Sequence, residues 1–214
     1  MISRTWDLTR NSKPKIMDTP YGNPDTLIGA ALAPLDWTRS VGLVFAFSLL
    51  TALAAQFVIP IGPVPITGQT FAVLLTGALL GSRLGAMAMI AYLVEGASGL
   101  PFFFGGTGGI LHLLGPTGGY LVAFPAAAFI TGAFAEHGWD KRLLTAIAAM
   151  TIGSVLIILS GWAWFALSTH TPATVAFVNS VAKFIPGEII KVLLAAAALP
   201  SGWALLKRKA SNGS

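Results

Sequence analysis

Two side chains near the end of the sequence have the types and spacing that could bind a ligand. Glu188 and Lys191 lie three residues apart in a long apolar stretch, so a helix would place them on one face. Pro186 lacks an N–H and Gly187 lacks a Cβ, which favours a kink or an irregular turn just before the acid. If this stretch crosses a membrane, each buried charge costs about 3 kcal/mol or more and turns toward a partner or a ligand. We therefore expect this segment to form one wall of a ligand site.

The same pair has a structural alternative, in which Glu188 and Lys191 only neutralise each other. Glu95, inside another apolar stretch, makes the charges uneven, because two deep carboxylates then share one deep ammonium. Lys183 does not balance them if its long side chain reaches the membrane interface. The uneven charges favour the ligand site, and the buried pair remains the alternative.

The composition indicates a membrane protein. Of the 214 residues, 55% are hydrophobic and only 10% are charged, and the mean hydropathy is +0.76, whereas soluble domains carry about 25% charged residues. The sequence has no cysteine, which excludes disulfides, thiolate metal ligands and a thiol nucleophile. The histidines His112, His137 and His170 fall in different loops. We therefore expect no metal site and no cofactor.

The apolar stretches are long enough to predict an all-α membrane protein with six transmembrane helices in one bundle. The expected spans are residues 41–59, 69–80, 84–100, 120–134 and 143–165, with a sixth within 173–206. The chain would then divide into a cytoplasmic N-terminal tail over residues 1–40, a substrate-binding membrane domain over 41–206 and a basic cytoplasmic tail over 207–214.

The basic residues predict which ends of these helices face the cytoplasm. The loops after the first, third and fifth spans contain neither Lys nor Arg. The other loops and the two tails hold Arg4, Arg10, Lys13, Lys15, Arg39, Arg83, Lys141, Arg142, Lys207, Arg208 and Lys209. This alternation is the positive-inside pattern, with both termini cytoplasmic. It also explains the isoelectric point near 9.8 through contacts with membrane lipids, so we expect no nucleic-acid partner.

The rise of a helix places the polar exceptions at a similar depth. Glu188 precedes Lys207 by 19 residues, or about 28 Å, and Glu95 lies about 18 Å beyond Arg83. Gln69 begins its span from the outer side, where the glycine-rich loop 101–119 also lies. These positions predict a pocket near the extracellular side. The alternative for Gln69 is a polar residue that merely ends a helix.

Four motifs resemble one known family. They are Gly-Pro-Val-Pro-Ile-Thr-Gly-Gln-Thr-Phe at 62–71, Glu-Gly-Ala-Ser-Gly-Leu-Pro at 95–101, Gly-Pro-Thr-Gly-Gly-Tyr at 115–120 and Pro-Gly-Glu-Ile-Ile-Lys at 186–191. Together they are similar to the BioY family, the biotin-binding S components of energy-coupling factor (ECF) transporters. The resemblance covers about residues 40–205. It implies a membrane subunit that captures biotin from outside and works with a transmembrane T component and cytoplasmic ATPases. Some members are thought to act without dedicated partners, alone or as a homo-oligomer.

The resemblance also suggests binding residues. The family motif Pro-Gly-Asp-x-x-Lys corresponds to residues 186–191, with Glu188 in place of the aspartate. A carboxylate could accept the ureido N–H groups of biotin, and Lys191 could donate to the ureido carbonyl or pair with the valerate carboxylate. Tyr92 and Tyr120 could instead meet lipid headgroups, and Phe104 could belong to an interfacial belt. The full set of candidates is Gln69, Tyr92, Glu95, Phe104, Gly105, Tyr120, Glu188 and Lys191.

Small residues four apart in the first span suggest a helix contact. Ser48 and Ala52, and likewise Thr51 and Ala55, allow another helix to approach closely. Docking of a partner subunit and packing inside the bundle explain them equally well. The BioY family has an Ala-x-x-x-Ala docking motif in this span, which these residues resemble without matching it.

Biotin uptake across the cytoplasmic membrane, with no enzymatic activity, is the function that the sequence favours. The alternatives are an S component for another small vitamin, an intramembrane enzyme with Glu95 and Glu188 as acid and base, and an assembly subunit without a ligand.

Overall fold

The computed structural model describes residues 25–32 and 35–212 as a bundle of helices. Residues 1–24 of the predicted N-terminal tail and residues 213–214 of the C-terminal tail lie outside this part of the chain. The α-helices are α1 Leu27–Leu32, α2 Trp37–Ala54, α3 Gln69–Leu80, α4 Ser82–Ala97, α5 Ile110–Leu114, α6 Gly118–Glu136, α7 Leu143–Ser168, α8 Ala173–Phe177 and α9 Ile185–Asn212. The short elements are strands β1 Val58–Ile59 and β2 Ile66–Thr67, 3₁₀ turns η1 Phe104–Gly106 and η2 Trp139–Lys141, and the π-helix η3 Val178–Ala182.

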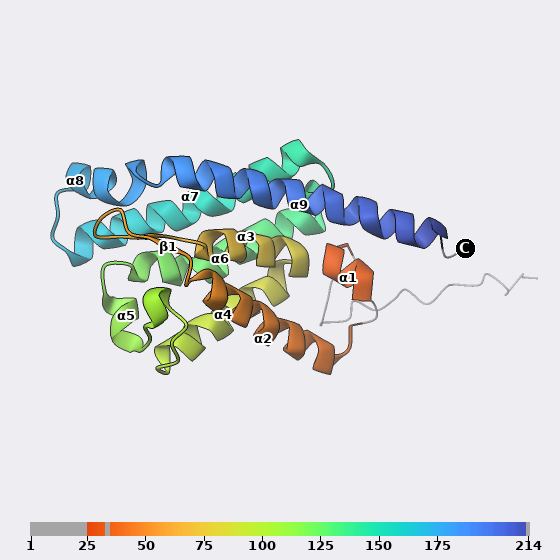
Figure 1. Cartoon of the computed structure of the whole chain (residues 1–214), viewed down its shortest axis with the longest axis horizontal. Coiled ribbons are helices and arrows are strands. Elements are labelled where there is room, and N and C mark those ends of the chain that lie inside the picture. Colours follow the sequence, from red (N-terminus) through yellow and green to blue (C-terminus); the bar gives the residue numbers. More distant parts are fainter. Residues whose placement is uncertain (1–24, 33–34, 213–214) are drawn as a thin grey trace, which may run out of the picture.

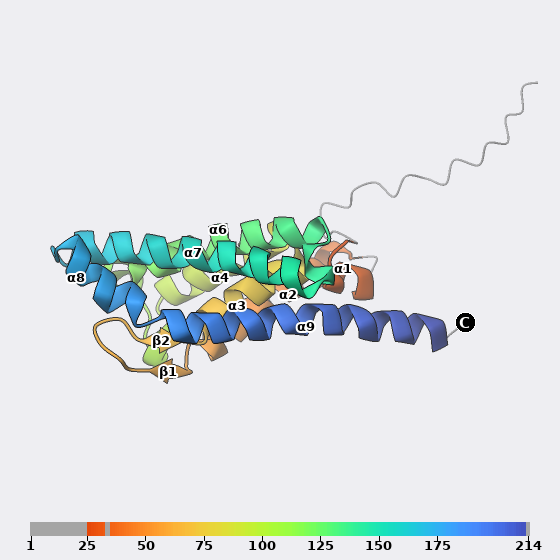
Figure 2. The ribbon, with the colours of Figure 1, turned by 90° about the horizontal axis from the view of Figure 1, so that it is seen from above.

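The long helices lie beside one another. In Figure 1, α9 follows one edge of the bundle, α2 lies at the other edge, and α3, α4 and α6 run between them. Figure 2 shows α3 between α9 and the layer that α6 and α7 form. Strands β1 and β2 pair antiparallel, with Val58 opposite Thr67, and form a small hairpin near the start of α9.

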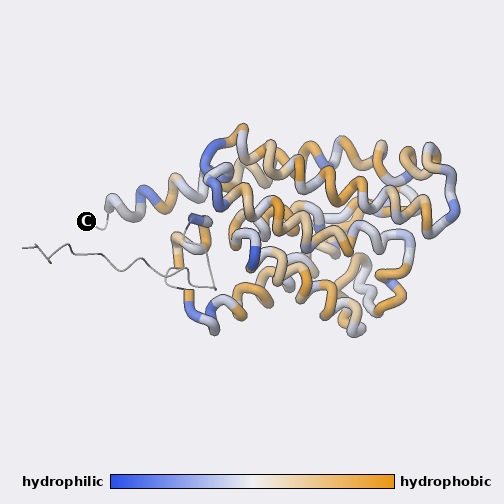
Figure 3. The backbone as a smooth tube through the Cα atoms, turned by 180° about the vertical axis from the view of Figure 1, so that it is seen from behind, coloured by the Kyte–Doolittle hydropathy of each residue, from blue (hydrophilic) through white to orange (hydrophobic). Residues whose placement is uncertain are grey.

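Four of the described helices are long and apolar enough to cross a membrane. They are α2, α6, α7 and the part of α9 over Ile185–Arg208. Figure 3 shows hydrophobic residues along these helices and hydrophilic residues mainly at their ends. Helix α3 has only 12 residues and occupies the predicted range 69–80, and α4 has 16. The mostly helical fold is confirmed, whereas six spans and cytoplasmic termini stay predictions.

The last apolar stretch is not one continuous helix. Helix α8 passes into the π-helix η3, and α9 begins only at Ile185. Pro186 lies in the first turn of α9, where a missing N–H removes no helical hydrogen bond. The irregularity predicted before Glu188 is therefore present, and it places this acid in the first turn of the new helix.

Small residues let the central helices touch. A Cβ added to Gly77 of α3 would lie 2.3 Å from the carbonyl oxygen of Ala128 in α6. A Cβ on Gly132 would lie 2.4 Å from the backbone of Ser82, at the start of α4. The backbones can approach so closely only because these positions lack side chains.

The chain before residue 40 is partly packed against the bundle. Helix α1 contacts α3 and α9, and Thr26 and Leu35 are buried. The first residues of α2 also belong to the predicted tail. The boundary at residue 40 remains a prediction, but the described part of this segment contributes to the packing.

Asp140, in the turn between α6 and α7, is a buried acid. Trp203 of α9 donates its Nε1–H to Asp140 Oδ2 at 2.5 Å, and Asp140 is only 2% exposed. Its Oδ1 has no hydrogen-bond partner within the described residues. Burial raises the pKa of this carboxyl above its ordinary value of 3.8, and the Trp203 bond opposes this only in part.

This pKa predicts how stability depends on pH. A carboxyl whose pKa is raised on folding binds protons more tightly in the folded state, so its contribution to stability falls as pH rises from about 4 through the folded-state pKa. Asp140→Asn still accepts from Trp203 but cannot ionise. We expect the melting temperature of the variant to rise relative to wild type over this range. Thermal unfolding in detergent from about pH 4 to pH 8 checks this, and a pH-independent difference would contradict it.

Candidate functional site

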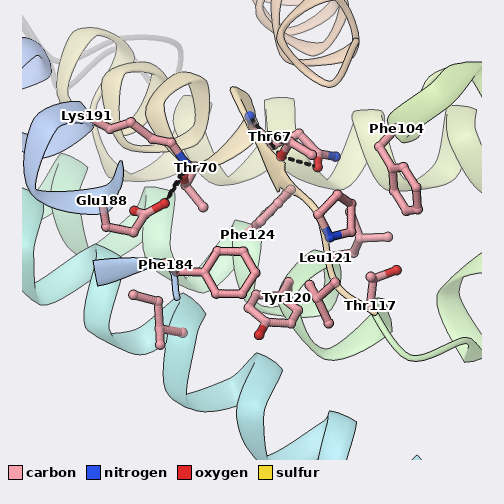
Figure 4. A pocket seen from close by; sticks show the side chains of 14 residues that line it. Thr67, Thr70, Phe104, Thr117, Tyr120, Leu121, Phe124, Phe184, Glu188 and Lys191 are labelled. Carbon is pink, nitrogen blue, oxygen red and sulfur yellow. Dashed lines mark hydrogen bonds and ion pairs between the residues drawn. The ribbon is translucent and has the colours of Figure 1, made fainter. Parts of the chain in front are cut away.

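A pocket lies where the starts of α3, α6 and α9 meet the loops before and between them. Charged side chains lie at one end, and most of the other lining side chains are apolar, with the polar Thr67, Gln69 and Thr117 between them. Figure 4 shows Lys191, Thr70 and Glu188 together at one end, with Phe104 at the other. The lining residues are Val64, Pro65, Thr67, Gln69, Thr70, Phe104, Thr117, Tyr120, Leu121, Phe124, Ile158, Phe184, Glu188 and Lys191.

Glu188 is the centre of the polar end. Its Oε1 lies 2.6 Å from Lys191 Nζ and accepts the hydroxyl proton of Thr70 at 2.8 Å. Its Oε2 accepts from the hydroxyl of Ser154 at 2.9 Å. The side chain is 8% exposed, so three donors compensate a carboxylate that is almost removed from solvent.

Lys191 has capacity left for a ligand. Its ammonium donates to Glu188 and, at 2.9 Å, to the hydroxyl oxygen of Thr70. An ammonium has three N–H donors, and these are its two hydrogen bonds within the described chain. Because Lys191 lines the pocket, the third N–H is available to a group that enters it.

Gln69, the first residue of α3, is a second polar group of the pocket. Its Oε1 accepts from the hydroxyl of Thr67 at 2.8 Å, and its Nε2 donates to the hydroxyl of Tyr92 at 2.6 Å. Gln69 is 6% exposed. The amide is therefore held at both ends rather than free in solvent.

Aromatic and loop residues close the apolar part. The Tyr120 hydroxyl donates to the carbonyl of Ser180 in η3 at 2.6 Å, and its ring lies 6.2 Å from that of Phe184. Val64 and Phe104 come from two different loops. The cavity between the side chains is about 40 Å³, which is room for a few water molecules.

Comparison with known proteins decides the family. The model of the BioY family matches residues 24–208. The chain belongs to the BioY family. Over 158 residues it is 43% identical to the probable biotin transporter BioY of Pyrococcus horikoshii, which covers 73% of this chain and 91% of the relative. It is 37% identical to the biotin transporter BioY of Rhizobium etli over 182 residues, covering 76% and 97%.

A solved structure is similar as well. The crystal structure of the S-component for biotin from an ECF-type ABC transporter matches this BioY-family chain with a TM-score of 0.70 and 26% identity. The match covers 78% of this chain and 93% of the other.

The structure of this BioY-family chain brings five of the eight candidate residues together at the pocket. They are Gln69, Phe104, Tyr120, Glu188 and Lys191. Tyr92 is fully buried and touches Gln69 from behind instead of lining the pocket. Gly105, with a positive φ of 68°, belongs to the same turn as Phe104 but does not line the pocket.

Glu95 lies apart from these five residues, although the sequence placed it at a similar depth. Its Oε2 accepts a hydrogen bond from Ser48 Oγ, and it lines a separate apolar groove between α2 and α4. Residues at the same depth of a helix can point in different directions, because each step along the helix turns the side chain by about 100°. The Tyr92 side chain points toward Gln69, and the Glu95 side chain points toward α2.

The candidate docking residues, three in α2 and Ala55 directly after it, do not form an exposed stripe. Ser48, Thr51, Ala52 and Ala55 are 0–5% exposed. Ser48 contacts Glu95, and Thr51 Oγ1 lies 3.9 Å from Met89 Sδ of α4. This face packs inside the chain because α4 occupies the space that small side chains leave. These four side chains are therefore not a free docking surface in this structure.

Sequence reasoning missed Thr70, Ser154 and Thr67. Thr70 follows Gln69 directly, so its place beside a candidate was a usable signal. Ser154 is a hydroxyl in the middle of an apolar helix, where it needs a partner. Its partner, Glu188, is 34 residues away, and only the packing of α7 against α9 shows the connection.

Proposed function

We propose that this protein takes up biotin as the substrate-binding S component of an ECF-type transporter. The observation that carries the proposal is the cluster of the buried Glu188 with Lys191 and Thr70 at one end of a mainly apolar pocket. The relatives of this multi-pass membrane protein are named as biotin transporters and not as enzymes. The separation of Glu95 from Glu188 also argues against the alternative of an intramembrane enzyme, because an acid–base pair must share a site.

The pocket suits the chemistry of biotin. The ureido ring carries two N–H donors and one carbonyl, and the valerate chain ends in a carboxylate. Lys191 can donate its third N–H to the carbonyl or to the carboxylate, and Glu188 can accept from a ureido N–H. Leu121, Phe124 and Phe184 offer apolar surface to the thioether ring and the chain. Both orientations of the ligand use the same polar end.

Membrane topology is part of the proposal. We place six spans in the membrane, both termini in the cytoplasm and the pocket toward the outer side. The contacts of α9 support a cytoplasmic end of the bundle that the charged segments share. Both α1 and the turn η2, which contains Lys141, pack against α9. The pocket lies toward the other end of α9, at its first turns.

Partners follow from the family. A transmembrane T component and cytoplasmic ATPases would drive uptake, since the similar crystal structure is an S-component of an ABC transporter. Action alone or as a homo-oligomer is the alternative. Exposed apolar residues on α2, such as Phe45, Leu49 and Leu53, face lipid or such a partner.

A thermal-shift measurement on detergent-solubilised protein tests the ligand. Biotin should raise the melting temperature in proportion to the logarithm of its concentration above the dissociation constant, and other water-soluble vitamins should not. A shift with another vitamin alone would identify the alternative S component. The absence of any shift would favour the assembly subunit. Recovery of chemically altered ligand would support the alternative of an intramembrane enzyme.

Glu95→Gln provides a negative prediction for the same assay. The variant is nearly isosteric, still accepts a hydrogen bond from Ser48, and changes no residue that lines the pocket. We therefore expect biotin affinity within about twofold of wild type, since charges outside the site act weakly. Isothermal titration of biotin measures this. A loss of tenfold or more would return Glu95 to the site.

A further inference from the structure

Tyr92 and Gln69 form a chain of hydrogen bonds with a fixed direction. The Tyr92 hydroxyl donates to the carbonyl of Phe102 at 3.1 Å. A carbonyl can only accept, so the single hydroxyl proton of Tyr92 is used there. Tyr92 must then accept from Gln69, and only the Nε2 end of an amide can donate.

The other end of the amide is compatible with this direction. The backbone N–H of Gln69 donates to Thr67 Oγ1 at 3.3 Å, and the Thr67 hydroxyl donates to Gln69 Oε1 at 2.8 Å. A hydroxyl can donate or accept, so Thr67 could also accept from a flipped amide. At Tyr92, however, the oxygen of a flipped amide would require the hydroxyl proton that now goes to the Phe102 carbonyl. Flipping would therefore cost one of these two hydrogen bonds at a buried site.

The same hydroxyl connects Gln69 with the loop that carries Phe104. Phe103 packs edge-on against the Tyr92 ring, with centroids 5.7 Å apart, and is fully buried. Gly96 makes room for it, because a Cβ there would lie 2.4 Å from the Phe103 ring. The backbone before Phe104 is thus anchored on Tyr92 by its carbonyl and by the neighbouring ring.

From this geometry we propose that Tyr92 is a positioning residue that fixes the polarity of the Gln69 amide. The remaining N–H and the remaining oxygen lone pair of Gln69 are then the groups that it offers to the pocket. A donor next to an acceptor complements a ligand edge with a carbonyl beside an N–H, as in a ureido or cyclic amide group. Tyr92 acts through Gln69 and does not touch the ligand. The inference rests on the proposed function, because it takes biotin as the ligand with such an edge.

A double-mutant cycle on biotin affinity tests whether Tyr92 acts through Gln69. Gln69→Ala and Tyr92→Phe should each weaken binding by about fivefold to tenfold, the value of one hydrogen bond. The double variant should be no weaker than Gln69→Ala, because Tyr92 has nothing to orient once the amide is gone. Tyr120→Phe is the matched control. It also loses a bond from a buried tyrosine hydroxyl to a carbonyl, but its effect should multiply with that of Gln69→Ala.

Ligand selectivity separates positioning from a general loss of stability. Wild type should prefer biotin over 2-iminobiotin, in which an imino nitrogen replaces the ureido oxygen, so that this acceptor is lost. Tyr92→Phe should reduce this preference severalfold, because the amide can then turn. Multiplicative losses in the cycle, or an unchanged preference in Tyr92→Phe, would overturn the proposal that Tyr92 orients Gln69. Failure of wild type to bind biotin would overturn the proposed function itself, and this role of Tyr92 with it.

Discussion

Lys191→Met should weaken biotin binding by about a hundredfold or more and lower the melting temperature. The variant removes the ammonium 2.6 Å from Glu188 Oε1 and leaves a carboxylate that is 8% exposed without its cation. Truncating one partner of a buried charge pair costs about 3–5 kcal/mol, much of it from the charge left behind. The ligand also loses a charged donor. Isothermal titration and thermal unfolding of the same preparation measure both effects.

The double variant Lys191→Met with Glu188→Gln separates the two causes. The neutral amide needs no cation and can still bond with Thr70 and Ser154, so we expect the melting temperature to recover much of its loss. Binding should not recover, because the donor to the ligand is still missing. Wild-type affinity in Lys191→Met would show that the pair is structural. If the double variant melts at a temperature as low as that of Lys191→Met, the unpaired charge of Glu188 is not the cause of the lost stability.

Gly161→Ala should be a strongly damaging single-methyl change at the pocket wall. A Cβ at Gly161 of α7 would lie 2.3 Å from the ring of Tyr120. The ring is held at its other end by the bond to Ser180, so it cannot yield without losing that contact and moving the pocket wall. Overpacking of this kind costs about 1–3 kcal/mol. We expect a lower melting temperature and at least about tenfold weaker biotin binding.

Gly42→Ala is the matched control. Gly42 lies inside α2, and a Cβ there meets no atom within 4 Å. Alanine favours a helix over glycine by about 1 kcal/mol, so this variant should be neutral or slightly stabilising and should bind biotin normally. Equal effects of the two substitutions would mean that the contact with Tyr120 does not constrain the pocket.

Much of the helical order could be predicted from the sequence, because it depends on local composition. Apolar stretches bounded by glycine, proline or charge predict helices wherever they are long enough, and α3 occupies the predicted residues. The helix break before Glu188 was also local, since proline and glycine act on their own backbone. The i, i+3 spacing placed Glu188 and Lys191 on one face, as their 2.6 Å contact shows.

Gln69 and Tyr92 show where sequence reasoning about the site ended. The sequence offered both as ligand contacts, and the structure places one at the pocket and the other behind it. A sequence shows which residues are polar. It does not show which of them faces the pocket and which lies behind another polar residue. The carbonyl of Phe102, which accepts the Tyr92 proton, reaches this place through the loop after α4.

The sequence by itself determined a membrane bundle, the position of its helices along the chain and the pair of charges at its polar end, because each depends on residues close in sequence. Only the tertiary structure decided which faces meet. It sent Glu95 toward Ser48 rather than Glu188, buried the small residues of α2 against α4, and brought Ser154 to Glu188. The physical reason is that the rise of a helix fixes the depth of a residue, whereas its direction toward a neighbour depends on packing between distant segments.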